Sequence, residues 1–119
     1  MTSNGNYDIF VAKRGSDGSV AWAKNLGGSS FEVGSSIATD SSGNTYTIGR
    51  FSGTATFGST TLTSNGSEDI FVAKLGSDGS VAWAKSFGGS GGDFGNSIAT
   101  DSSGNLYTTG DFTDTATFG

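Results

Sequence analysis

The sequence predicts an all-β protein that contains two copies of one structural unit. Twenty-one of the 119 residues are glycine, and long helices are disfavoured because each glycine inside a helix costs about 0.5–1 kcal/mol relative to alanine. The chain also carries valine, isoleucine, aromatic residues and abundant threonine, which favour strands. The segment 8–13 returns as the segment 69–74. A repeated unit of strands predicts antiparallel sheets that stack on one another.

The spacing between these two segments, which we call the repeat offset, holds along the whole chain. Trp22 returns as Trp83 and Tyr46 as Tyr107, with no insertion or deletion between them. Pairing residues 2–58 with residues 63–119 gives 57 positions, of which 42 are identical. Because identity is high even in the turns, either the repeat was copied recently or the sequence was designed to be repetitive. We divide the chain into repeat 1 (residues 1–61) and repeat 2 (residues 62–119).

Glycine-rich turns divide the repeat into four main strands and a small hairpin. The expected main strands are residues 36–40, 45–51, 69–75 and 80–87, and the expected hairpin strands are residues 54–57 and 60–63. Gly43 and Gly79 lie in the turns between main strands, where tight hairpin loops need a positive φ that glycine adopts without steric cost. These elements predict one antiparallel sheet in which the small hairpin lies between the second and third main strands.

The alternation of side chains predicts that both faces of this sheet are covered. In residues 20–26, Val20, Trp22 and Leu26 lie on one face of the strand, and Ala21 and Ala23 lie on the other. A sheet that is apolar on both faces is buried on both faces. Since bulky groups lie on one face and small groups on the other, we expect each sheet to be covered by the next copy of the same sheet.

The ordered motifs of the repeat resemble the SBBP-type β-propeller repeat of bacterial proteins. The matching segments are residues 69–75, 78–79, 83–85, 87–89, 97–101 and 104–107. Repeat 1 carries the same motifs, except that Arg14 stands where repeat 2 has Leu75. The resemblance implies propeller blades of four antiparallel strands and an extracellular or envelope origin of the parent protein. It implies no enzymatic activity and no cofactor.

Two tryptophans are the candidates for contacts between blades. The segment from Gly18 to Trp22 resembles the Gly-x-x-x-Trp motif of quinoprotein propellers, in which the tryptophan docks one blade onto the next. The resemblance implies this docking role for Trp22 and for its counterpart Trp83. Alternation agrees, because it places each tryptophan beside a valine on the bulky face. The alternative interpretation is that these rings stack on sugars, as in lectins.

The expected strand order leaves an incomplete sheet at each end of the chain. Only residues 36–87 form a whole blade, whereas residues 8–26 supply the last two strands of one blade and residues 97–112 the first two of another. A propeller closes with about four to eight blades. We therefore expect a closed homo-oligomer, a trimer ahead of a tetramer, completed by strand exchange between subunits. The expected seam residues are Ile9, Phe10, Val11, Tyr107 and Phe112.

A metal site is considered at the Asp-Ser-Ser-Gly-Asn turns. The candidate ligands are Asp40 and Asn44, with their counterparts Asp101 and Asn105. Calcium binds clustered oxygen ligands, but the spacing lacks the repeated acidic residues of a calcium loop. A hairpin turn closed by an aspartate hydrogen bond accounts for the same residues, and we expect no metal here.

Catalysis is not expected, because the chain has no histidine and no cysteine. These residues are the commonest general base and the best nucleophile. The formal charge of −5 disfavours nucleic acid and anionic membranes as partners. Residues 1–5 have neither the basic nor the apolar region of a signal peptide, and we expect a soluble chain.

Two hypotheses for the function follow from the sequence. The first is a structural module that assembles with copies of itself. The second is a lectin-like or protein-binding module that uses the loops at one mouth of the ring. Positions that differ between the repeats, such as Tyr7 and Glu68 or Arg50 and Asp111, are interpreted as surface positions without a specific role.

Overall fold

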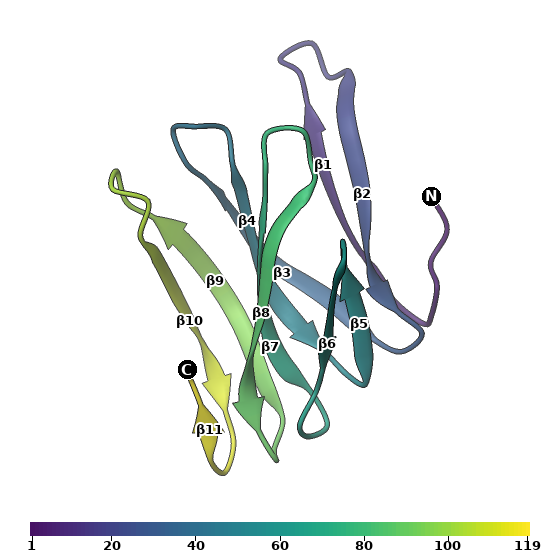
Figure 1. The fold of residues 1–119 in the computed structure, drawn as a ribbon, viewed down its shortest axis with the longest axis vertical. Helices are drawn as coiled ribbons and strands as arrows, with labels where there is room; N and C mark the ends of the chain where they lie inside the picture. Colours follow the sequence, from purple (N-terminus) through teal and green to yellow (C-terminus); the bar gives the residue numbers. More distant parts are fainter.

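The computed structural model describes all 119 residues, which form eleven strands and no helix (Figure 1). The strands are β1 (Ile9–Arg14), β2 (Val20–Gly28), β3 (Glu32–Thr39), β4 (Thr45–Phe51), β5 (Thr54–Phe57), β6 (Thr60–Thr63), β7 (Asp69–Leu75), β8 (Val81–Gly89), β9 (Asp93–Thr100), β10 (Leu106–Phe112) and β11 (Ala116–Thr117). Strands β2, β3 and β4 return as β8, β9 and β10 at the repeat offset. No helix that could cross a membrane occurs. The all-β prediction is confirmed.

The central sheet contains the four main strands predicted for one blade. These four strands lie in the order β3-β4-β7-β8, with the short strand β11 beside β8, and neighbouring strands are antiparallel. Strands β4, β5, β6 and β7 have the predicted bounds, whereas β3 begins at Glu32, before the predicted position 36, and β8 ends at Gly89, after the predicted position 87. The extra residues include glycines that were interpreted as breaks. One of them, Gly89 at the end of β8, instead lies where two backbones approach closely: a Cβ there would lie 1.7 Å from the Thr115 carbonyl oxygen.

Two half-sheets flank the central sheet. The N-terminal half-sheet consists of β1 and β2, and the C-terminal half-sheet consists of β9 and β10. Strand β1 pairs only with β2, and β10 pairs only with β9, so each half-sheet ends in an unpaired edge strand. Figure 1 shows these two edge strands on opposite sides of the molecule.

The small hairpin joins a different sheet from the predicted one. The hairpin of β5 and β6 extends the N-terminal half-sheet, where Gly28 of β2 pairs with Ala55 of β5. In repeat 2, β11 pairs with β8 in the same way. Close approach explains the glycine, because a Cβ on Gly28 would lie 2.1 Å from the Thr54 carbonyl oxygen. The hairpin in repeat 1 and strand β11 in repeat 2 therefore each tie a sheet to the sheet that precedes it in the chain.

The core lies between the sheets, in two clusters. The first cluster joins the N-terminal half-sheet to the central sheet and is formed by Ile9, Val11, Leu26, Phe51, Ala55, Phe57, Phe71, Ala73, Leu75 and Ala84. The second cluster joins the central sheet to the C-terminal half-sheet and is formed by Tyr46, Ile48, Ile70, Val72 and Ile98. Strand β7 supplies Phe71 to one cluster and Ile70 to the other. The central sheet is therefore buried on both faces, as its alternation predicted.

Candidate functional site

Large apolar side chains are exposed at the two ends of the chain. They are Phe10 on β1, Tyr107 and Phe112 on β10, and Phe118 at the C-terminus, each with 55–71% of its surface exposed. The repeat counterparts of these four side chains, Phe71, Tyr46, Phe51 and Phe57, are all buried. The same sequence thus makes a covered surface in the middle of the chain and an open one at each end.

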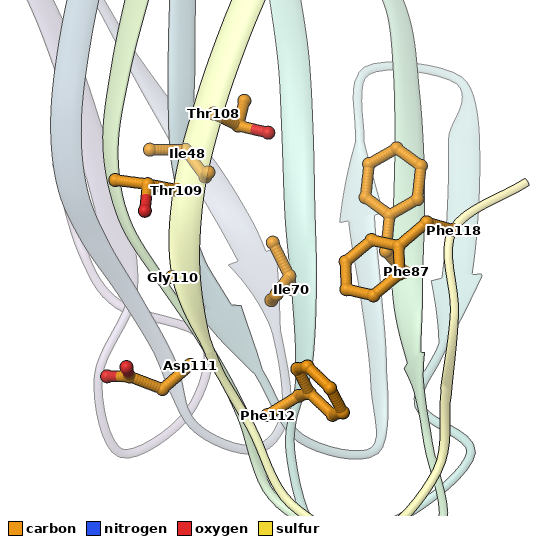
Figure 2. Close-up of a pocket in the computed structure, with 9 residues that line it drawn as sticks. All are labelled: Ile48, Ile70, Phe87, Thr108, Thr109, Gly110, Asp111, Phe112 and Phe118. Carbon is orange, nitrogen blue, oxygen red and sulfur yellow. The ribbon is translucent and has the colours of Figure 1, made fainter.

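The open end of the C-terminal half-sheet contains a pocket of about 250 Å³, which we call the terminal pocket (Figure 2). Its lining residues are Ile48, Ile70, Phe87, Thr108, Thr109, Gly110, Asp111, Phe112 and Phe118. Phe118 stacks on Phe87 with 6.2 Å between ring centroids, and Phe112 meets Phe118 edge to face at 6.1 Å. The walls of the pocket are therefore mainly aromatic and aliphatic.

The counterpart of the terminal pocket in repeat 1 is filled. Its walls include Ile9, Leu26, Phe51 and Phe57, all of which are buried. The ring of Phe71 occupies this space: it lies 4.9 Å from the Phe57 ring, and its Cε1 atom would lie 2.8 Å from a Cβ on Gly49. Figure 2 labels Gly110, the counterpart of Gly49, in the wall of the terminal pocket.

The predicted seam residues occupy four environments. Ile9 and Val11 are buried in the first core cluster, where they hold the N-terminal half-sheet against the central sheet. Phe10 points to the other side of β1 and is exposed, as period-two alternation requires. Phe112 lines the terminal pocket, and Tyr107 donates its hydroxyl to Asp101 at 2.9 Å. Within one chain, the structure does not bring the β1 residues and the β10 residues together.

The two tryptophans differ in what they contact. The Trp22 indole N–H donates to the carbonyl oxygen of Ser77 at 3.0 Å. Its ring also covers the following turn, since a Cβ on Gly79 would lie 2.7 Å from Trp22 Cδ2. Trp83 packs beside Tyr46, with 6.4 Å between centroids, and its indole N–H makes no hydrogen bond. Trp22 therefore rests on the sheet that follows it in the chain, whereas the sheet on which Trp83 would rest is incomplete.

The metal candidates form closed turns. The Asp40 carboxylate accepts hydrogen bonds from the Ser42 and Asn44 backbone N–H groups, the Asn44 side-chain amide and the Tyr46 hydroxyl, at 2.9–3.0 Å. The hydrogen bond from the Asn44 side chain is the largest of the effects that lower the pKa of Asp40 to about 2. Asp101 and Asn105 repeat this arrangement, and the pKa of Asp101 is likewise about 2. Both carboxylate oxygens of Asp40 and of Asp101 thus accept hydrogen bonds that close the turn.

Sequence reasoning missed two pairs of acidic side chains at the joints between sheets, in which Glu32, Asp69 and Asp93 are buried and Asp8 is partly buried. Asp69 and Asp93 are fully buried, and the Oδ1 atom of each lacks a hydrogen-bond partner. Both approach Gly88, because a Cβ there would lie 2.6 Å from Asp93 Oδ2 and 2.7 Å from Asp69 Oδ1. Burial first, and then the charge of Asp93, raises the pKa of Asp69.

The same arrangement recurs in repeat 1 with Asp8 and Glu32. A Cβ on Gly27 would lie 3.0 Å from Glu32 Oε2 and 3.2 Å from Asp8 Oδ1. Burial is the largest cause of the raised pKa of Glu32, and the charge of Asp8 adds to it. The sequence contains one signal of these pairs. Position 32 and its repeat counterpart are both acidic, with Glu32 in repeat 1 and Asp93 in repeat 2.

One position interpreted as a surface position has a specific contact. Arg50 forms the single ion pair of the structure, with its Nε 2.7 Å from Glu68 Oε2. The Arg50 guanidinium also lies 4.8 Å from the centre of the Phe94 ring. This ion pair joins β4 to the segment that enters β7. Its counterparts at the open ends of the chain are Asp111 and Tyr7.

A comparison with protein families gives one match, within repeat 2. Residues 82–111, which run from β8 through β10, match the family model for the SBBP beta-propeller repeat. This match confirms the resemblance drawn from the sequence motifs. No curated protein matches the chain.

Proposed function

We propose that the chain is a structural β-propeller module that assembles with further copies of the repeat into a closed ring and carries no catalytic activity. One observation carries the proposal. The C-terminal half-sheet repeats the first two strands of the central sheet, and the N-terminal half-sheet repeats its last two strands. Each half-sheet can therefore supply the two strands that the other half-sheet lacks.

The central sheet supplies a register for joining the half-sheets. In it, Thr47 of β4 lies opposite Ala73 of β7. At the repeat offset, the same register places Thr108 of β10 opposite Ala12 of β1 from a second copy. We call this joint the seam. Pairing at the seam covers two edge strands that would otherwise invite uncontrolled association.

The ring needs whole copies of the repeat. A propeller closes with about four to eight blades, and each chain contributes the strands of two blades. We favour a trimer with six blades and consider a tetramer with eight blades next. In a solution of the 119-residue chain, another copy of the chain supplies the missing strands. Head-to-tail contacts of this kind form a closed ring when the rotation between subunits closes.

Native mass spectrometry and light scattering at several protein concentrations test this proposal. We expect a single closed species of three or four subunits, each of 11.9 kDa, that dissociates on dilution. An open series of sizes that grows with concentration would contradict ring closure. A folded monomer with a cooperative thermal transition at every concentration would overturn the proposed assembly.

A further inference from the structure

The terminal pocket is half of a joint whose other half is present elsewhere in the same sequence. We infer that it is the receptor for the Phe10 side chain of a second copy of the chain. This inference rests on the proposed assembly and names the side chain that fixes the register of the seam.

The internal counterpart shows how the pocket is filled. Phe71 enters the space between Gly49, Phe51 and Phe57 and is completely buried there. Gly49 leaves room for this ring, since a Cβ would lie 2.8 Å from Phe71 Cε1. The joint thus consists of one aromatic side chain and a glycine-floored aromatic pocket.

Each residue of that joint has a repeat counterpart at one of the two open ends of the chain. Phe71 becomes Phe10, and its pocket becomes Gly110, Phe112 and Phe118. Phe10 is 71% exposed on the free edge strand β1, so it is available to a partner. The three receptor residues all line the terminal pocket (Figure 2). Both halves are therefore present, unfilled, at opposite ends of the chain.

Three lining positions of the terminal pocket differ from their internal counterparts: Thr109 stands in place of Ile48, Asp111 in place of Arg50 and Phe87 in place of Leu26. The change at Phe87 keeps this wall apolar and gives it a larger side chain. Phe87 is also stacked on Phe118, which places the Phe118 ring at the pocket before any partner arrives.

The Phe10 contact also specifies the register of the seam. Side chains alternate between the two faces of a strand, so a slip by one residue would turn Phe10 away from the pocket. It would also leave Phe112 and Phe118 exposed. Backbone pairing alone is compatible with several registers, whereas a single large side chain in one pocket is compatible with one.

A double-mutant cycle tests this inference on the full chain. The variants are Phe10→Ala, Phe118→Ala and the double variant, and the measured quantity is the dissociation constant of the assembly. Both side chains are exposed in the isolated chain, so truncation leaves its internal core intact, which circular dichroism at low concentration checks. We expect Phe10→Ala to weaken assembly at least about 30-fold, the size of an interface hot spot. The double variant should lose much less than the sum of the two single losses.

The outcomes separate this inference from the proposed function. A wild-type chain that never assembles overturns the proposed function itself. An assembly in which Phe10→Ala has the wild-type dissociation constant overturns only the receptor role of the pocket. Independent, additive losses from the two substitutions would place Phe10 in some other contact and overturn it as well. The conservative variant Phe10→Leu should recover part of the affinity, because leucine still fills part of the pocket.

Discussion

The Trp22 indole N–H donates a hydrogen bond to the carbonyl oxygen of Ser77, 55 positions later in the sequence. Trp22 lies on β2 of the N-terminal half-sheet, and Ser77 lies in the turn that joins β7 to β8 of the central sheet. The contact therefore links two consecutive sheets. The counterpart of this contact would join Trp83 to Ser16 of a further copy, across the seam.

Removing the Trp22 ring should destabilise the chain itself. Trp22→Ala deletes the hydrogen bond to Ser77 and the packing over Gly79, and we expect a loss of about 2 kcal/mol, below the range for a fully buried tryptophan because the ring is partly exposed. Chemical denaturation at low protein concentration measures this loss. Trp83→Ala is the matched control, because Trp83 has no such acceptor within the chain. It should chiefly weaken the assembly.

The sugar-stacking alternative makes the opposite prediction for the stability of Trp22→Ala. If the tryptophans bind carbohydrate, Trp22→Ala should keep the wild-type stability and the wild-type assembly and lose only binding. A glycan array run on wild type and variant would show that difference. Retained stability together with lost glycan binding would contradict the docking role.

Much of the fold follows from the sequence, and the errors have a common cause. Strands β4 and β7 were predicted to the residue, because the turns beside them have ordinary glycine signatures. Gly88 and Gly89 were misinterpreted as the end of a strand: both belong to β8, and Gly89 lies where two backbones meet too closely for a Cβ. Local pattern cannot separate these two uses of glycine, because the neighbouring strand is distant in the sequence. The sheet that receives β5 and β6 was missed for the same reason.

The candidate site was predicted in part. The open edge strands β1 and β10 follow from counting strands in a repeat with a known order, whereas the seam between copies stays a prediction. The terminal pocket does not, because its walls come from β4, β7, β8, β10 and the C-terminal residues. Likewise, Asp69 was interpreted only as the start of a strand, and its approach to Asp93 becomes visible once the sheets are stacked.

The buried pair of Asp69 and Asp93 should make stability depend on pH. The pKa of Asp69 is raised in the folded chain, so its contribution is fully present below the unfolded value, near 3.8, and is lost as the pH rises through the raised value. Asp69→Asn removes the ionisable group and with it this loss of stability at high pH. The asparagine side chain can still accept the hydrogen bond from the Asn65 backbone N–H. We expect the variant to melt several degrees higher than wild type at pH 8, with the difference shrinking toward pH 4.

Asp78→Asn is the control for the pH experiment, because its effect has the opposite sign. Hydrogen bonds from Ser80 lower the pKa of Asp78, so its contribution is present above the unfolded value and is lost as the pH falls through the lowered one. Asp78→Asn should therefore give no stabilisation at pH 8. The charged group that acts on Asp69 is its partner Asp93. A melting difference between Asp69→Asn and wild type that is constant from pH 4 to pH 8 would contradict the electrostatic explanation.

A charge exchange at the seam should test the pairing of β10 with β1. In the central sheet Arg50 is paired with Glu68, and their counterparts across the seam are Asp111 and Tyr7. Tyr7→Glu would place two carboxylates together and weaken assembly, by a few-fold at each seam, since partly exposed charge pairs are worth about 0.2–1 kcal/mol. Adding Asp111→Arg copies the internal ion pair and should restore assembly. The measurement is the dissociation constant at low salt, and a double variant as weak as Tyr7→Glu alone would contradict this alignment.

Cysteine cross-linking should report the register of the seam directly, because the chain has no cysteine of its own. In the central sheet Thr47 lies opposite Ala73, so Thr108 of one copy should lie opposite Ala12 of the next, at a Cα separation that a disulfide can span. The variant Ala12→Cys/Thr108→Cys should therefore form disulfides between chains on oxidation. A denaturing gel without reductant should show a ladder that ends at the size of the closed ring.

The matched control, Thr47→Cys/Ala73→Cys, uses the same register inside one chain and should remain a monomer on that gel. Lys13→Cys/Thr108→Cys moves one cysteine to the opposite face of β1 and should cross-link poorly. Efficient cross-linking of this last pair, with none from the first, would show that the seam has a different register and that Phe10 does not enter the terminal pocket.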